Sequence, residues 1–265
     1  PKTKVIGVEP NNSTCLHDAI KANERVVLDN VGIFADGVAV KQIGEHTFPL
    51  IQPYVDDVIL VSVDDICAAI KDIYDETRSV VEPAGALSLA GLKQYISNES
   101  CQDQNLVTIN CGANMNFDRL RHVAERAEIG ESKESLLAVT IPETPGSLLE
   151  FCNAIGKRTI TEFNYRLQDP KKAHIFLGIG TSDQEDHEQL LSTLNDHNYQ
   201  VSDLTNNESA KLHIRHMIGG VPHTPIPNER FFRVQFPERP GALSQFLSDF
   251  KLNWNISCFH YRNHG

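Results

Sequence analysis

Apolar and polar positions alternate along residues 1 to about 128 in a pattern that predicts strands and helices in turn. Short apolar runs predict buried strands at 5–8, 58–61 and 106–109, the first ending at Glu9-Pro10 because proline disfavours further pairing. Helices are expected from a Ser13 cap through Lys21, over 64–75, from Pro83 to Ile96, and over 116–127. Strands that alternate with helices indicate a mostly parallel sheet covered on both faces.

The pattern changes after Gly130, where the polar residues 131–135 are typical of a linker. The elements expected next are a strand at 136–141, a helix at 147–155, strands at 159–165 and 174–179, a helix at 185–196 and a strand at 200–204. This β-α-β-β-α-β order is the ferredoxin-like arrangement. The sequence therefore predicts an α/β domain over 1–130 and an α+β domain over 136–210.

Part of the second domain is repeated. The segment P-E-T-P-G-S-L at 142–148 recurs as P-E-R-P-G-A-L at 237–243, and E-F-N-Y-R at 162–166 recurs as C-F-H-Y-R at 258–262. The repeat predicts a partial second ferredoxin-like domain over 230–265, after a stiff Gly/Pro linker at 219–227. Because the chain opens on a strand and ends at a turn, we expect truncation at both ends; a natural domain with short tails is the alternative.

Composition narrows the class of protein. The 265 residues are 40% hydrophobic and 22% charged, with a formal net charge of −11. This balance argues against nucleic acid or an anionic membrane as the main partner, and no apolar run approaches a membrane span. The six cysteines are scattered without a C-x-x-C pair, which favours reduced thiols in the cytoplasm.

Three segments are candidates for ligand binding. Residues 111–114 (C-G-A-N) follow a predicted strand and 82–86 (E-P-A-G-A) precede a predicted helix, which is where open α/β sheets bind ligands. The turn at Pro145–Leu148 offers free N–H groups that can bind a carboxylate. The alternatives are a glycine connection with a packed cysteine, a first-turn acid, and a simple tight turn. A metal at His213, His216 and His223 is disfavoured because their spacing matches no strong metal-site pattern.

These motifs resemble a known family. V-E-P at 8–10, D-G-V-A-V at 36–40, V-E-P-A-G-A at 81–86 and C-G-A-N-M-N-F at 111–117 are ordered like the later part of a pyridoxal-phosphate-dependent β-elimination enzyme of fold type II. F-N-Y-R at 163–166 and F-H-Y-R at 259–262 resemble the twin ACT-like regulatory modules of biosynthetic threonine deaminase, also called threonine ammonia-lyase. The resemblance covers essentially the whole chain.

The resemblance implies that threonine forms a Schiff base with pyridoxal phosphate and leaves as 2-oxobutanoate and ammonia, the first step of isoleucine biosynthesis. It implies isoleucine inhibition that valine opposes, a homotetramer, and a cytoplasmic or, in a plant-like host, plastid location. The residues it places around the cofactor are Gly37, Glu82, Cys111 and Gly112. Cys111 takes the place of a serine beside the ring nitrogen, where a neutral thiol is expected to serve the same role.

Two parts that the resemblance requires do not occur in the sequence. No lysine, including Lys21, Lys41 and Lys71, has the Ser-Phe-Lys context of the Schiff-base lysine, and the glycine run that holds the cofactor phosphate is absent. We therefore expect this chain alone to be inactive. A non-catalytic amino-acid-binding regulator is the alternative; a catabolic serine or threonine dehydratase is disfavoured because that class generally lacks two such modules.

The resemblance also implies regulatory and metal residues. The expected effector surface comprises Pro145, Gly146, Leu148, Asn164, Tyr165, Arg166, His260, Tyr261 and Arg262. Arginine can bind an effector carboxylate with two hydrogen bonds, although an ordinary surface charge is the alternative. Glu9 resembles the acidic ligand of a cation in related enzymes, but Cys15 stands where those relatives have a second acid.

Overall fold

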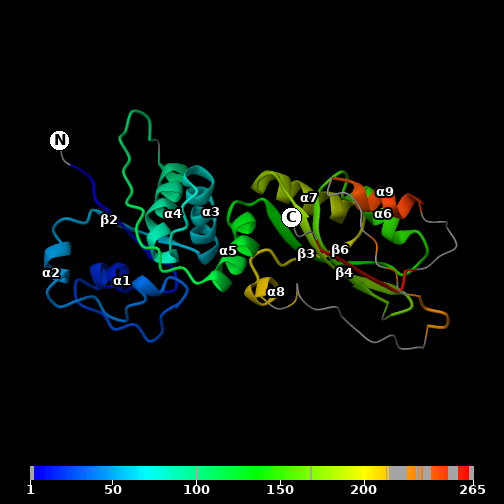
Figure 1. Ribbon diagram of the computed structural model, residues 1–265, viewed down its shortest axis with the longest axis horizontal. Helices are drawn as coiled ribbons and strands as arrows, with labels where there is room; N and C mark the ends of the chain where they lie inside the picture. The colour runs from blue at the N-terminus through cyan, green and yellow to red at the C-terminus, as the bar shows by residue number, and fades with distance from the viewer. Residues whose placement is uncertain are drawn as a thin grey trace. The chain divides into compact units, whose positions relative to one another are not determined.

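The computed structural model describes residues 3–99, 101–167, 169–212, 214, 226–230, 232, 234, 240–249 and 256–262. Its contacts divide the chain into two compact units, 1–131 and 132–265. Each unit is described by itself below (Figure 1). Among the described residues, no helix has both the length and the apolar character needed to cross a membrane.

The sheet of the first unit contains two parallel strands. Strand β1 (Ile6–Pro10) pairs with β2 (Asp57–Val61) from Ile6 opposite Asp57 to Pro10 opposite Val61. The strand thus ends at Pro10, as predicted, although Glu9 and Pro10 still pair with β2. The N–H of Asn11 donates to the Val61 carbonyl at 2.8 Å, and N–H groups alternate in direction along a strand. The N–H that Pro10 lacks would point away from β2, so proline is tolerated at this position.

Helices make up a little under half of the first unit. They are α1 (Cys15–Ala22), α2 (Phe48–Ile51), α3 (Val63–Thr77), α4 (Pro83–Asn98) and α5 (Phe117–Gly130), with a short 3₁₀ helix η1 (Asp36–Val38). The four longest are confirmed predictions. Ser62 and Asp65 form a reciprocal capping box at the start of α3. Ser13 does not cap α1, since Thr14 occupies the N-cap position and the Ser13 hydroxyl donates to the Val38 carbonyl at 3.3 Å.

The core of the first unit lies between α3, α4 and α5. The predicted apolar stripe of α3 is buried, with Ile66, Ala69, Ile70 and Ile73 all at most 4% exposed. Helices α3 and α5 approach closely at Gly130, which has no side chain. A Cβ atom there would overlap the backbone of Asp64. The side chain of Asp64 also binds Arg126 of α5, with 2.5 Å between Oδ1 and Nε. This buried ion pair fixes the two helices against each other.

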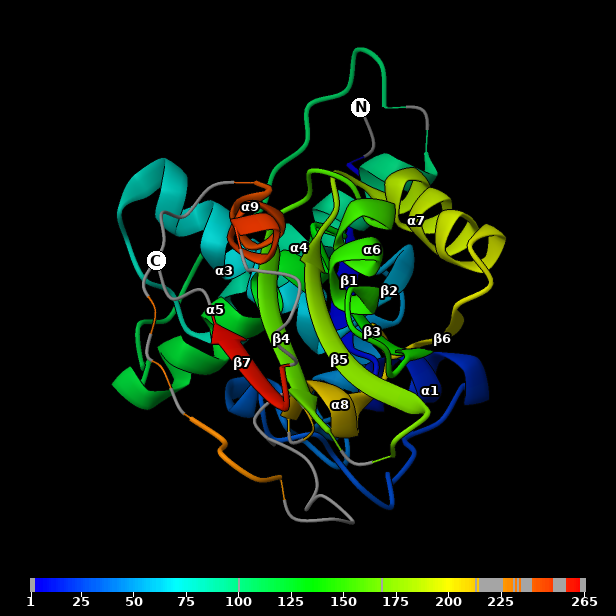
Figure 2. The same cartoon turned by 90° about the vertical axis from the view of Figure 1, so that its right-hand side faces the viewer.

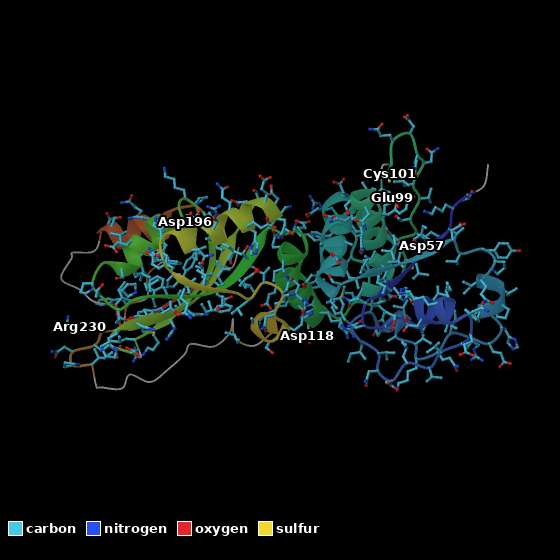
Figure 3. All side chains as sticks on the ribbon, turned by 180° about the vertical axis from the view of Figure 1, so that it is seen from behind. Asp57, Glu99, Cys101, Asp118, Asp196 and Arg230 are labelled. Atoms are coloured by element: carbon cyan, nitrogen blue, oxygen red, sulfur yellow. The ribbon has the colours of Figure 1, made fainter. Side chains whose placement is uncertain are left out.

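The predicted strand at 106–109 is wrong for the described residues. The segment between α4 and α5 is a loop that projects from the unit beyond Glu99 and Cys101 (Figure 3). Val107 is 85% exposed and Ile109 is 75% exposed. An apolar run becomes a strand only when another strand supplies hydrogen-bond partners, and no described segment pairs with this one.

The second unit is an antiparallel sheet whose longer helices cover one face (Figure 2). Its strands are β3 (Glu134–Pro142), β4 (Ile160–Arg166), β5 (Lys172–Gly180), β6 (Gln200–Asp203) and β7 (Cys258–Arg262). Its helices are α6 (Ser147–Ala154), α7 (Gln184–Asp196), α8 (Glu208–Leu212) and α9 (Ala242–Asp249). The strand order β6-β3-β5-β4 and the elements from β3 to β6 confirm the predicted ferredoxin-like arrangement.

The polar residues before this domain belong to it. Glu134 and Ser135 were expected in a linker, but they begin β3 and are 5% and 1% exposed. The Thr161 hydroxyl donates to the Glu134 carboxylate at 2.5 Å, and Ser135 hydrogen-bonds to His187 at 2.7 Å. Polar side chains can therefore be buried here because each has a hydrogen-bond partner.

The two repeats meet in one sheet, where β7 adds to the edge beside β4 (Figure 2). Asn164 lies opposite His260, which is its own counterpart 96 residues later in the chain. The flanking pairs mirror each other, since Phe163 faces Tyr261 and Tyr165 faces Phe259. A local twofold axis therefore passes between Asn164 and His260. The division of this unit into two regulatory domains stays a prediction.

Candidate functional site

Three segments of the first unit converge at the start of α4. The backbone N–H of Glu82 donates to the Gly112 carbonyl at 3.1 Å, and the backbone N–H of Asn114 donates to the Glu82 carboxylate at 3.1 Å. A Cβ atom at Gly37 would lie 3.3 Å from the same carboxylate. The predicted cofactor residues Gly37, Glu82 and Gly112, which are far apart in sequence, are thus neighbours around one carboxylate.

Glycines make this convergence possible. A side chain at Gly112 would overlap the carboxyl group of Glu82, and its φ of +74° is also one that other residues rarely adopt. A side chain at Gly85 would overlap the backbone carbonyl of Cys111. The glycines therefore form a cradle, defined here as Gly37, Gly85 and Gly112, that brings the Cys111 loop against the N-terminus of α4.

Cys111 differs from the buried cysteines of the chain. Its residue is exposed, whereas Cys15, Cys67 and Cys152 are buried. Burial alone raises the pKa of the Cys152 thiol to about 12. Cys111 therefore presents an accessible thiol beside a backbone cradle with no room for side chains. Both features fit the ring side of a pyridoxal phosphate site, where a neutral donor and close backbone approach are needed.

The predicted metal ligand Glu9 binds the start of helix α1 in the structure. Its carboxylate accepts the backbone N–H groups of Leu16 at 2.9 Å and His17 at 2.8 Å. The Cys15 thiol donates to the same carboxylate at 3.5 Å, and burial, together with the charge of Glu9, raises the pKa of Cys15 to about 11. Both oxygens of Glu9 are thus used for helix capping. No group of three metal-binding side chains occurs in the described part of the chain.

We expect Glu9→Gln to destabilise the fold by about 1–3 kcal/mol, because an amide has one acceptor and no charge to place against these N–H groups. Thermal unfolding with and without calcium or magnesium measures this. The variant should melt earlier in every buffer, and neither ion should stabilise the unmodified protein. Stabilisation by an ion that is lost in Glu9→Gln would show that Glu9 binds metal instead. Glu24→Gln is the control, because no described hydrogen bond involves the Glu24 side chain.

A second candidate site lies between the two repeats. A pocket is lined by the end of α6, the start of β4, Gly241 with the first turn of α9, and Tyr261 of β7. Its wall includes apolar side chains, and the N-terminus of α9 supplies backbone N–H groups. Arg158 also lines this pocket, and its buried Nε has no hydrogen-bond partner among the described residues. The pocket combines an apolar wall with donors suited to a carboxylate, and its free space of about 20 Å³ is that of a single water molecule.

The predicted effector residues do not all lie in this pocket. Tyr261 lines it, while the equivalent Tyr165 donates from its hydroxyl to Glu143 at 2.6 Å. Burial raises the pKa of Glu143, and the bond from Tyr165 opposes that shift. Arg166 binds Glu229, with 2.6 Å between Nη1 and Oε1. Asn164 and His260 hydrogen-bond to each other across the twofold axis.

The remaining predicted residues lie in the turn of the first repeat or outside the residues that the structure describes. Pro145 and Gly146 are exposed, and Leu148 packs against the core. Arg262 lies opposite Glu162 in β7, but its side chain is outside the described residues. Several other segments also lie outside the described residues. They are His213, Arg215, His216 and His223, residues 219–225 of the predicted linker, 237–239 of the repeated motif, and the final turn at 263–265.

Sequence reasoning missed Arg158, and it named effector residues in the turn of the first repeat only, not Gly241 and the start of α9 in the second. The repeat does contain a sign of the turn, because Gly241 is the counterpart of Gly146 and both glycines have a positive φ. Nothing in the sequence near Arg158 indicates a ligand. Its role depends on β7 lying next to β4, which brings residues from the two repeats together.

The two units thus define a two-part protein, in which an α/β part with a cofactor cradle is followed by a ferredoxin-like part with a pocket between repeats. Residues 1–112 match the family of pyridoxal-phosphate dependent enzymes. Residues 125–214 and 223–265, just over half of the chain, match the C-terminal regulatory domain of threonine dehydratase. The chain belongs to the threonine dehydratase family, and the predicted fold class is confirmed.

Two curated relatives agree with this assignment. The biosynthetic L-threonine dehydratase IlvA of Pasteurella multocida is 52% identical over 266 residues, covering 100% of this chain and 52% of the relative. IlvA of Escherichia coli shows the same identity and coverage. The structure of processed threonine deaminase isoform 2 from Solanum lycopersicum is 44% identical, with a TM-score of 0.47 over 48% of this chain and 35% of that one. The chain spans about half the length of the curated relatives it matches.

Proposed function

We propose that this chain is part of a threonine ammonia-lyase that converts L-threonine to 2-oxobutanoate and ammonia with pyridoxal phosphate. The observation that carries the proposal is the convergence of Gly37, Glu82, Cys111 and Gly112, which come from three motifs far apart in the sequence, around the start of α4. The family match of residues 1–112 supports the cofactor. We also propose a homotetramer located in the cytoplasm, or in the plastid of a plant-like host.

Pyridoxal phosphate, when bound, supplies the electron-accepting ring for loss of the α-proton and the β-hydroxyl group. The residues of this chain position that ring. Cys111 offers a neutral and weak hydrogen-bond donor to the ring nitrogen, so the nitrogen is not forced into its charged form. Glu82 holds the loop that carries Cys111, because its carboxylate accepts the backbone N–H of Asn114.

The test of activity compares the complete protein with this 265-residue chain. Release of 2-oxobutanoate from threonine should require the complete protein, with the chain alone giving only the background of free cofactor. Activity of the chain alone would contradict the proposed inactivity. A complete protein that binds isoleucine but releases no 2-oxobutanoate would instead be a non-catalytic amino-acid-binding regulator.

We further propose that isoleucine and valine bind in the pocket between the repeats, which must widen from its observed water-sized volume to admit them. The effector carboxylate would bind Arg158 and the N–H groups at the start of α9, and the branched side chain would contact the apolar wall formed by Cys152, Ile155 and Leu243. Two donors of Arg158 already bind the Ile155 carbonyl, at 3.2 Å, and Asp186. The unused buried Nε supports this assignment, since an arginine donor without an acceptor is costly to bury.

Arg158→Gln in the complete protein is expected to raise the isoleucine concentration for half-inhibition by about 10- to 100-fold, because a hydrogen bond to a charged group contributes about 1.5–3 kcal/mol. Inhibition curves at fixed threonine measure the change. Lys157→Gln is the matched control, because it removes the same charge from the neighbouring exposed residue. Equal inhibition of both variants and the unmodified protein would place the effector elsewhere.

A further inference from the structure

Arg166 ends β4 in the first repeat, and its partner belongs to the second. The guanidinium binds Glu229 through both carboxylate oxygens, at 2.6 Å from Nη1 to Oε1 and 3.5 Å from Nη2 to Oε2. The side chains of Arg166 and Glu229 are only 16% and 23% exposed. The Ser257 hydroxyl donates to the same carboxylate. Shielding from water makes such a two-pronged pair stronger than an ordinary surface ion pair.

The position of Glu229 is set by its own repeat. In the first repeat, the Thr161 hydroxyl donates to Glu134. Glu229 follows Glu134 by 95 residues and Ser257 follows Thr161 by 96, which are the two offsets that relate the repeated motifs. The same glutamate–hydroxyl contact therefore occurs in both repeats. Glu229 is an intrinsic part of the second repeat, and Arg166 reaches across the boundary to bind it.

This contact lies at the end of a short strand pairing on which the pocket depends. Strand β7 has five residues, and Arg166 faces its first residue, Cys258. Tyr261 lines the pocket only in the observed register, because a slip of one residue would turn its side chain to the other face of the sheet. A short edge strand specifies its register weakly unless something fixes it.

We propose that Arg166, Glu229 and Ser257 form a clasp that holds the two repeats in the register required by the amino-acid pocket. Arg166 is then a positioning residue whose guanidinium binds Glu229 and not the effector carboxylate. The lowered pKa of Glu229, caused mainly by the hydrogen bond from Arg166, is consistent with this pairing. This inference rests on the proposed amino-acid site between the repeats. It adds which residues hold the two repeats together at that site.

The test measures isoleucine binding to the complete protein by titration calorimetry. Arg166→Gln and Glu229→Gln should each raise the dissociation constant about tenfold, within the range typical of coupled sites. The charge exchange of Arg166→Glu with Glu229→Arg should restore most of the affinity. Arg230→Gln is the matched control, since it removes a charge from the exposed neighbour of Glu229 and should leave binding unchanged (Figure 3).

The Glu229→Gln result separates the clasp from direct effector binding. If Arg166 bound the effector carboxylate, Glu229 would compete with it, and Glu229→Gln would tighten isoleucine binding. Tighter or unchanged binding in Glu229→Gln overturns the clasp. If the unmodified protein binds no isoleucine, the proposed function fails instead, and hydrogen exchange of residues 258–262 then judges the clasp. Faster exchange in Arg166→Gln supports it, and unchanged exchange overturns it.

Discussion

Arg126→Ala is expected to destabilise the first unit by about 3–5 kcal/mol, the cost typical of removing one partner from a buried ion pair. Arg126 is 5% exposed and binds Asp64 at 2.5 Å, so the substitution leaves a buried carboxylate without this cation. The carboxylate cannot move to water easily, because Gly130 packs directly against the Asp64 backbone. The loss would appear as a lower midpoint of urea unfolding followed by circular dichroism.

Two variants make the Arg126 result interpretable. Arg121→Ala on the same helix removes an exposed pair with Glu125 and should cost less than about 1 kcal/mol. The double replacement Asp64→Asn with Arg126→Met removes both charges and should recover part of the stability lost in Arg126→Ala. A cost in Arg126→Ala no larger than in Arg121→Ala would mean that the ion pair does not hold α3 and α5 together.

Gly85→Ala is expected to lower the proposed threonine ammonia-lyase activity of the complete protein by about 100-fold, the effect of a misplacement of about 1 Å at a reacting centre. Only backbone atoms of Cys111 oppose the added methyl group, so the overlap cannot be relieved by a side-chain rotation. The Cys111 loop must therefore move away from α4. Release of 2-oxobutanoate and the absorbance of bound pyridoxal phosphate measure the change.

The matched control is Gly180→Ala. An added Cβ there would meet its nearest neighbours at ordinary distances of 3.4–3.9 Å, and the variant should keep both activity and cofactor. If Gly85→Ala also kept both, the cradle would have no part in holding the cofactor, and the assignment of Cys111 to the ring nitrogen would lose its structural support.

Local patterns explain which elements could be predicted from the sequence. Helix α3 was predictable because its apolar stripe and its Ser62–Asp65 cap lie within a few residues of each other. The elements of the ferredoxin-like domain were predictable for the same reason. The strand at 106–109 failed, because its apolar residues carry no information on whether a partner strand is adjacent.

The sites divide in the same way. The proposed cofactor residues could be named because each lies in a motif that resembles the family, and the structure brings Gly37, Glu82 and Gly112 together. The place of Arg158 in the pocket and the pairing of Arg166 with Glu229 could not be predicted. Both arise only when β7 lies beside β4. Side chains separated by more than 60 residues acquire these roles from packing, which no short motif describes.

The axis between Asn164 and His260 also has a consequence for the origin of the regulatory part. Two separate copies of one small domain would pair in this same way, each presenting an identical strand to the other as an isologous dimer does. Joining the copies in a single polypeptide removes the need for identical halves. One half can keep asparagine while the other adopts histidine, so a fused pair can evolve two unlike faces from one symmetric ancestor.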